Sequence, residues 1–240
     1  MNKLFKDPKK RYLNLILIIL PFLILAGVFG FTSYKSIKDI FGNASGEVNK
    51  NDYKVSIDEY GYYLRGNATD LQIEYFRELE DLINDGTDNS AIAASIAKNY
   101  VADFYTWTNK NGSYDIGGMH YVYGPSKNVI IAQARNTYYK YLTYYINTFG
   151  KDKLLEVTSV ETEVDSNPST YEVDGHTYES YFVTCNWKYK NEETFDGMNI
   201  VSPNEYGSYD HYWHFTTREY FTVVVTEDGR FEIVEAFGDY

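Results

Sequence analysis

The longest hydrophobic pattern in the chain lies near its start. Residues 12–34 form a run of 23 residues without a charged side chain. A helix of this length extends about 34 Å, at about 1.5 Å per residue, which is enough to cross a hydrocarbon core of about 30 Å. Pro21 and Gly27 are compatible with such a helix, because membrane helices tolerate both residue types. The pattern therefore predicts one transmembrane helix over residues 12–34.

A cleaved signal peptide is the alternative interpretation of this segment. Its apolar region would span about 7–15 residues and would end in a small-x-small cleavage site. The observed run is longer, and residues 26–30 (AGVFG) are a poor cleavage signal. We therefore expect a helix that stays in the membrane.

The charges that flank the run predict its orientation. Five basic residues and one acidic residue, Asp7, precede it, and two lysines follow it. Because basic flanks stay in the cytoplasm, residues 1–11 are expected inside the cell and the bulk of the chain outside it. Residues 35–54 are polar and lack periodicity, as a linker does. Residues 55–240 are then an extracytoplasmic domain held at the cell membrane by a single-pass helix.

Three segments of this domain repeat their apolar residues every three or four positions, which predicts helices. The expected helices cover 70–84, 90–107 and 127–149. Thr69 and Gln72 fit a capping box for the first helix, and Gly86 fits its end. Ser126 is the expected N-cap of the third helix, and Gly150 is its expected stop.

Beyond Gly150 the pattern changes from helical spacing to alternation, which predicts β-strands. The expected strands cover 155–164, 178–190, 211–226 and 230–237. Asp228-Gly229 predicts a type I′ hairpin between the last two. Helices followed by strands indicate an α+β domain, in which three helices pack on one face of a curved, four-stranded antiparallel sheet.

Charge and cysteine content narrow the possible classes of protein. The net charge is −12, but the first 38 residues hold seven Lys or Arg and one acidic residue, so the remainder carries −18. Such an acidic domain is repelled by phosphate backbones, which argues against a nucleic-acid partner. Cys185 is the only cysteine, so no internal disulfide can form and the domain depends on its hydrophobic core. Twenty-six Tyr and 14 Phe predict an unusually aromatic core.

Few residues offer chemistry at a recognisable spacing. His211 and His214 are three apart in a predicted strand, where they point to opposite faces and cannot chelate one ion. Cys185 lies on an apolar strand face, where a buried thiol is inert and its pKa is raised. A calcium-loop pattern that starts at Asp165 places His176 where a bidentate carboxylate is needed. We therefore expect no metal site and no cofactor.

Asp103 is the strongest candidate for a ligand pocket. It lies within a predicted helix beside aromatic residues, and burial among them would raise the pKa of its carboxyl. The candidate pocket consists of Tyr100, Asp103, Tyr138 and Trp187. The alternative is an Asp103 that faces outward, or one that hydrogen-bonds a nearby backbone amide or tyrosine hydroxyl.

The order of three helices and four strands resembles the nuclear transport factor 2-like cone, in which a strongly bent sheet wraps around helices. A cytoplasmic tail, one membrane helix and an outer cone are similar to the inner-membrane assembly proteins of type IV secretion and conjugation systems. Segments 101–106 (VADFYT) and 115–118 (DIGG) resemble membrane-anchored proteins of low-GC Gram-positive bacteria. Cone-fold enzymes of the ketosteroid isomerase type use a carboxylate and a tyrosine inside the cone. Taken by itself, segment 115–118 is interpreted as a glycine turn, because no strand precedes it and no helix follows it.

Two hypotheses for the outer domain follow. In the first, it is a non-catalytic protein-binding or assembly module of a secretion, conjugation or cell-envelope complex. Such a module can also form a homo-oligomer. In the second, the cone holds a small ligand or substrate against Asp103 and tyrosine hydroxyls. The absence of a nucleophile–base set favours the first. A deep cavity with converging polar groups would favour the second, and a filled core with an exposed Tyr/Phe patch the first.

Overall fold

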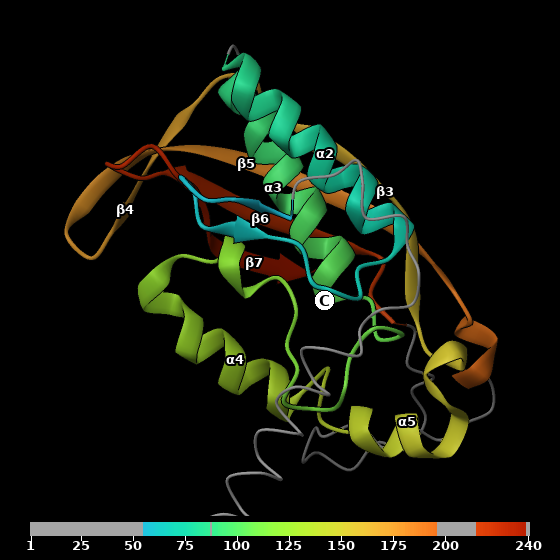
Figure 1. The fold of residues 1–240 in the computed structure, drawn as a ribbon. Helices are drawn as coiled ribbons and strands as arrows, with labels where there is room; N and C mark the ends of the chain where they lie inside the picture. The colour runs from blue at the N-terminus through green and yellow to red at the C-terminus, as the bar shows by residue number, and fades with distance from the viewer. Residues whose placement is uncertain (1–54, 87, 196–214, 239–240) are drawn as a thin grey trace, which may run out of the picture. The chain divides into compact units, whose positions relative to one another are not determined.

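The computed structural model describes residues 55–86, 88–195 and 215–238. The expected tail, transmembrane helix and linker lie outside these residues. In the described part of the chain, no helix is both long enough and apolar enough to cross a membrane. This part forms four α-helices, a five-stranded antiparallel sheet and a two-stranded sheet of β1 (Ser56–Ile57) and β2 (Tyr62–Tyr63), which confirms the α+β class (Figure 1).

Helix α2 (Asp70–Asp85) begins and ends where its sequence signals predict. The Thr69 hydroxyl accepts a hydrogen bond from the backbone N–H of Gln72 at 3.3 Å, and the Gln72 side chain accepts one from the backbone N–H of Thr69 at 3.0 Å. The predicted capping box is therefore confirmed. Gly86 ends the helix with a φ of +62°, a left-handed conformation that glycine adopts without strain.

Helix α3 (Asn89–Phe104) is the most deeply buried helix of the described chain. The side chain of Asp88 caps its N-terminus. The sequence predicts a helix to residue 107, but α3 ends three residues earlier. The backbone N–H of Trp107 donates instead to the carbonyl of Leu155 at 2.7 Å, which turns the chain away from the helix axis.

The third predicted helix, 127–149, is two helices in the structure. They are α4 (Lys127–Asn136) and α5 (Leu142–Phe149). Thr137 leaves the helical region with φ −122° and ψ −103°, and the adjacent Tyr138 and Tyr139 both reach carbonyl groups at the end of α3. Consecutive residues of one helix do not face the same side. The break therefore allows both tyrosines to contact α3.

The predicted start of the third helix and its predicted stop both coincide with helix ends in the structure. Ser126 is the N-cap residue of α4, as predicted, but its side chain makes no capping hydrogen bond. Gly150 follows α5 with a φ of +81°, and its N–H donates to the carbonyl of Ile146 at 3.0 Å. The predicted stop at Gly150 is therefore confirmed.

The main sheet has five antiparallel strands, one more than predicted. They are β3 (Glu156–Val164), β4 (Ser169–Val173), β5 (His176–Lys190), β6 (Arg218–Val225) and β7 (Phe231–Gly238). The order is β3-β5-β6-β7, and β4 pairs with the first residues of β5. One edge of the long strand β5 thus pairs with β4 and then with β3, while β6 pairs with its other edge.

The unpredicted strand β4 forms a tight hairpin with β5. Asp174 and Gly175 between these strands both have a positive φ, of 52° and 79°. A two-residue type I′ turn requires this conformation at both positions, and Asp-Gly is a favoured sequence for it. The type I′ signal therefore lies at residues 174–175.

The predicted hairpin at Asp228-Gly229 is confirmed, but its predicted turn type is wrong. Gly229 has a φ of 79°, whereas Asp228 does not have a positive φ. The Gly229 N–H donates to the carbonyl of Thr226, and the Thr226 N–H donates to the carbonyl of Arg230, each at 2.8 Å. This is a three-residue turn that ends in a left-handed glycine.

Strand β6 is shorter than the strand predicted at 211–226. Residues 215–217 precede it without strand structure. Residues 211–214, with the two histidines that were considered as metal ligands, lie outside the described residues. Among the described residues, no group of three His, Cys, Asp or Glu could hold a metal ion.

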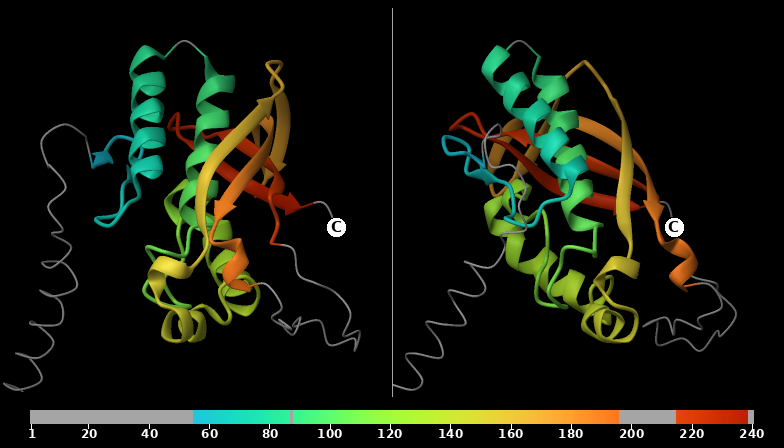
Figure 2. Two further views of the ribbon diagram at one scale, coloured as in Figure 1. Left: turned by 90° about the vertical axis from the view of Figure 1, so that its right-hand side faces the viewer. Right: turned by 45° about the vertical axis from the view of Figure 1, so that its right-hand side comes forward.

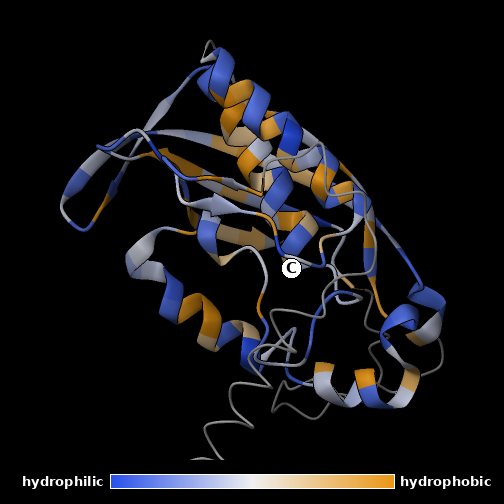
Figure 3. Ribbon diagram, viewed as in Figure 1, coloured by the Kyte–Doolittle hydropathy of each residue, from blue (hydrophilic) through white to orange (hydrophobic). Residues whose placement is uncertain are grey.

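The elements are arranged in three layers. In the left view of Figure 2, α2, α3 and the sheet follow one another, so that α3 is covered on both sides. Figure 3 shows hydrophobic residues along α3 and hydrophilic ones on the outward side of α2. The buried face of β5 carries Tyr181, Val183, Cys185 and Trp187, as the predicted alternation requires. We call this face of the sheet, which contacts α3, the inner face, and the opposite face the outer face.

Cys185 on the inner face is a free, buried thiol. Burial raises its pKa, so it is an inert part of the core, as the sequence predicts.

Candidate functional site

The most polar part of the core lies at the C-terminal end of α3 and is centred on Lys110, which is fully buried. The ammonium of Lys110 donates hydrogen bonds to the backbone carbonyl of Asp103 at 2.7 Å, to its carboxylate at 2.8 Å and to the side chain of Asn109 at 2.8 Å. An ammonium has three N–H donors, and all three are used. A buried charge is tolerated only when it is paired and hydrogen-bonded in this way.

Asp103 has a partner for each of its carboxylate oxygens. One oxygen accepts from Lys110 and lies 4.0 Å from Nε of Arg65, and the other accepts from the backbone N–H of Gly118 at 2.7 Å. Burial raises the pKa of the Asp103 carboxyl, but the charges of Lys110 and Arg65 lower it by more, so this pKa lies below its ordinary value. The alternative in which Asp103 hydrogen-bonds a nearby backbone amide is therefore confirmed. The raised pKa expected for an aspartate among aromatic residues is wrong, because two cations share the aromatic interior. Asp103 is therefore an ionised group and not a proton donor.

Arg65 links this ion pair to a second carboxylate. Its guanidinium is paired with Asp115, which also accepts a hydrogen bond from the backbone N–H of Asn111 at 2.8 Å. A β-carbon added to Gly117 would lie 2.4 Å from the backbone oxygen of Asp103. Segments 101–106 and 115–118, which carry the resemblance to membrane-anchored proteins, thus meet in space at the end of α3.

These contacts perform one structural task. The last carbonyl groups of a helix have no partner within that helix. At the buried end of α3, side chains donate to four successive carbonyl groups. The pairs are Gln72 with Ala102 at 2.8 Å, Lys110 with Asp103 at 2.7 Å, Tyr139 with Phe104 at 2.5 Å and Tyr138 with Tyr105 at 3.2 Å. A cation is also favourable at the negative end of the helix dipole. The polar cluster is therefore explained as the cap of a buried helix.

A small hollow borders this cap. Asp103, Arg65 and His120 are among the residues that line it, and it measures about 10 Å³. This is room for about one water molecule. Nε of Arg65 and Nε2 of His120 are buried and without a hydrogen-bond partner. Burial lowers the pKa of His120 to about 4, although Asp103 opposes that shift. A site for a small-molecule ligand requires a volume of about 300 Å³ or more, so the hollow is far too small to hold such a ligand.

The four residues of the predicted pocket do not come together. Asp103 borders the hollow, whereas Tyr100 stacks on Phe104 with ring centroids 5.1 Å apart. Tyr138 and Trp187 belong to an aromatic cluster around Tyr105, at centroid distances of 5.1 and 4.5 Å. The position of Tyr138 depends on the break between α4 and α5, which the helical periodicity does not reveal.

Glu219 is a half-buried carboxyl on the inner face that the sequence pattern did not single out. It accepts a hydrogen bond from the Tyr105 hydroxyl at 2.6 Å. Burial raises the pKa of Glu219 to about 7, and the hydrogen bond from Tyr105 opposes the shift. The available signal was its alternation with Phe221 and Val223, which places an acidic residue on the apolar face of β6.

An aromatic patch lies on the outer face of the sheet. The rings of Phe182 of β5 and Phe237 of β7 both stack on Tyr220 of β6 and are tilted to each other, with centroids 5.6 to 6.0 Å apart. Phe182 is 47% exposed and Phe237 is 42% exposed. We call these three residues the outer aromatic patch. Large apolar side chains that are exposed side by side are typical of binding surfaces.

Acidic side chains flank the outer aromatic patch. The strand register places Glu161 and Glu163 of β3 and Glu235 of β7 on the outer face. All three side chains are exposed. Arg218 lies at one end, with its guanidinium 5.1 Å from the ring of Tyr220. Glu161 and Glu163 therefore form one acidic flank of the patch on β3 and Glu235 forms the other on β7, whereas the exposed Lys188 of β5 lies with Arg218 at one end of the same face.

Comparison of the chain with models of known families, with curated proteins and with solved structures finds no match. The functional interpretation therefore depends on the arrangement of the described side chains. Two arrangements compete for it, namely the buried polar cap of α3 and the outer aromatic patch.

Proposed function

We propose that the chain is a membrane-anchored module whose extracytoplasmic domain binds a protein partner through the outer aromatic patch. One combined observation carries this proposal. The hollow beside Asp103 has room for about one water molecule, whereas Phe182 and Phe237 expose nearly half of their surface. A filled core with an exposed aromatic patch is expected of a binding module and not of a small-ligand pocket.

The hydrogen bonds of the polar cap give further support. Asp103 is engaged by Lys110, Arg65 and Gly118, and Lys110 has no free donor. A substrate at this position would have to displace contacts that satisfy the end of α3. The second candidate function, a cone-fold site with an acidic residue and a tyrosine, is favoured only at Glu219 and Tyr105, 2.6 Å apart.

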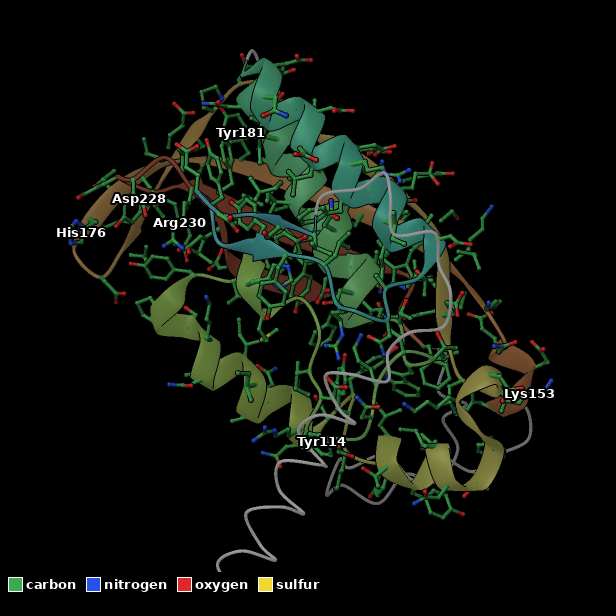
Figure 4. The ribbon with its side chains drawn as sticks, viewed as in Figure 1. Tyr114, Lys153, His176, Tyr181, Asp228 and Arg230 are labelled. Atoms are coloured by element: carbon green, nitrogen blue, oxygen red, sulfur yellow. The ribbon has the colours of Figure 1, made fainter. Side chains whose placement is uncertain are left out.

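We also infer a nuclear transport factor 2-like cone. The order of helices before strands and the position of α3 against the inner face support it. The tips of two hairpins meet, since His176 of the β4–β5 hairpin lies 3.1 Å from Glu227 of the β6–β7 turn. Figure 4 shows His176 close to Asp228 and Arg230 of that same turn. This proximity follows from the antiparallel pairing of the neighbouring strands β5 and β6, in which Glu179 lies opposite Val225.

The anchor and its orientation belong to the same proposal. The uncharged run at 12–34 and the basic tail before it support a location of the domain outside the cytoplasm. The large negative charge of the domain agrees with a protein partner better than with nucleic acid or an anionic lipid surface. A secretion, conjugation or cell-envelope complex is the proposed setting, following the resemblance in organisation.

The test compares two double variants of the full chain, purified from native membranes in mild detergent. Phe182→Ser/Phe237→Ser removes the outer aromatic patch. Val129→Ser/Tyr144→Ser is the control, because these residues of α4 and α5 are 68% and 59% exposed and lie outside the sheet. We expect the first variant to lose a co-purifying protein that the wild type and the control retain. Recovery of the wild-type chain alone, or equal recovery with both variants, would overturn the proposal.

A further inference from the structure

We propose that the docking element is a basic amphipathic helix of the partner, whose apolar stripe covers Phe182 and Phe237 and whose Lys or Arg side chains face the acidic flanks. This inference rests on the proposed function and specifies the chemistry of the partner. Its basis is the distribution of charge around the outer aromatic patch.

The acidic side chains lie on the two outermost strands of the outer face, and Glu235 shares β7 with Phe237, where its carboxylate accepts a hydrogen bond from the Thr222 hydroxyl at 3.1 Å. Glu161 and Glu163 belong to β3, and Glu235 belongs to β7. The strand order β3-β5-β6-β7 separates them by three strand spacings, which is roughly 14 Å at about 4.8 Å each. A helix with its side chains is about 10–12 Å in diameter. The interval between the flanks is therefore wide enough to hold one helix lengthwise.

The centre of this interval supplies the apolar contact. The rings of Phe182 and Phe237 are tilted to each other with their centroids 6.0 Å apart, so they form one continuous surface. Apolar residues that repeat at 3- and 4-residue spacing along a helix would cover both rings. Basic residues on either side of that stripe would then lie over Glu163 and Glu235. Charge complementarity of this kind sets the choice of partner and the rate of association.

The same charges disfavour a second copy of this chain on the patch. Two copies would bring Glu161, Glu163 and Glu235 against an equally acidic surface. The portion of the chain beyond residue 38 carries a net charge of −18, so the long-range field is repulsive as well. A partner of opposite charge meets neither obstacle.

The test uses the full chain in nanodiscs of zwitterionic lipid and two synthetic probes, with empty nanodiscs as the blank. One probe is an 18-residue helix of Leu and Lys, with the Lys on both sides of a Leu stripe. The other has Glu at every Lys position. We expect the Lys probe to bind and the Glu probe to fail, and we expect salt to weaken the Lys complex.

Three variants test where the Lys probe binds. Glu161→Gln/Glu163→Gln/Glu235→Gln should weaken binding about tenfold or more, since each lost charge pair removes attraction at a desolvated contact. Phe182→Ser/Phe237→Ser should weaken it as well. Glu74→Gln/Asp81→Asn/Asp85→Asn neutralises three exposed acids on α2, away from the sheet, and should bind as the wild type does.

Equal affinity for both probes, or equal binding by the two acid-neutralised variants, would overturn this inference. If the Phe182→Ser/Phe237→Ser variant still loses its natural partner in membranes, the proposed function stands and only the inference of a basic amphipathic helix fails. Self-association in nanodiscs that depends on Phe182 and Phe237 would also overturn it, because the occupant would then be a second copy.

Discussion

Lys110 illustrates, at the scale of a single residue, how a charge is kept inside an aromatic core. Its ammonium is held by Asp103 and Asn109 and lies at the carbonyl end of α3. The lysine therefore pairs with a carboxylate and also satisfies a helix carbonyl that has no other partner. Removing one member of such a buried pair leaves the other without compensation.

Lys110→Met should destabilise the domain strongly, because the carboxylate and the carbonyl of Asp103 would both lose their main partner. We expect a loss of about 3 to 5 kcal/mol in the free energy of unfolding, measured by chemical denaturation of the detergent-solubilised chain. Lys98→Met is the control, since Lys98 pairs with a half-exposed Glu78 and its loss should cost less than about 1 kcal/mol. Equal losses in the two variants would contradict the capping role.

Gly117 is the second residue with a specific steric requirement. A β-carbon there would lie 2.4 Å from the backbone oxygen of Asp103, whereas one at Gly124 would meet nothing within 4 Å. Gly117→Ala should therefore cost about 1 to 3 kcal/mol through overpacking. Gly124→Ala should leave the thermal midpoint nearly unchanged. A Gly117→Ala protein as stable as the Gly124→Ala protein would show that the two segments do not pack as described.

At the scale of secondary-structure elements, Glu219 couples the packing of β6 against the end of α3 to pH. Its pKa is raised to about 7 by burial, so between about pH 4.5 and 7 the folded state keeps a proton that the unfolded state releases. The stability from this group is present below that window and is lost as pH rises through it. The titratable groups that interact with it are Tyr100 and Tyr105 at the end of α3, Cys185 and Tyr189 of β5, and Tyr138.

Glu219→Gln should therefore remove the loss of stability with rising pH, because the amide stays neutral and still accepts a hydrogen bond from the Tyr105 hydroxyl. We expect the variant to match the wild type at pH 4 and to exceed it at pH 8 by about 1 to 3 kcal/mol, after allowance for partial exposure of the side chain. Unfolding curves at the two pH values measure the difference. A constant difference at both values would show that Glu219 does not titrate in this range.

The elements that the sequence predicts correctly are those set by local signals. The capping box at Thr69, the stops at Gly86 and Gly150, and the alternation of β5 each depend on a few neighbouring residues. The break after α4 could not be predicted, because it depends on carbonyl groups of α3 that lie more than 30 residues away. β4 was missed because its polar residues show little alternation, although Asp174-Gly175 was a usable turn signal.

In the candidate site, too, the features that depend on neighbouring residues could be predicted, whereas those that depend on residues far apart in the sequence could not. The inward position of Asp103 could be proposed from its aromatic neighbours, but its low pKa could not, since Lys110 and Arg65 reach it only in the folded chain. The outer aromatic patch joins three strands whose register the sequence does not specify. Its residues Phe182 and Phe237 lie in predicted strands, yet their proximity requires the order β5-β6-β7.

At the scale of the whole molecule, the proposed anchor predicts a protease pattern. Protease added to intact protoplasts should degrade a tag placed after residue 240 and spare a tag placed before residue 1, because the basic tail stays inside. Detergent should expose both tags. Protection of the C-terminal tag in intact protoplasts, or recovery of the chain in the medium, would contradict the orientation.

The most direct test of the binding surface is site-specific photocrosslinking in living cells. A photoreactive phenylalanine analogue is placed at Phe182 on the outer aromatic patch and, in a second strain, at the 68% exposed Val129 on α4. We predict a light-dependent adduct with another membrane-complex protein from position 182 and none from position 129. Absence of an adduct at position 182, or the same adduct from both positions, would contradict the account.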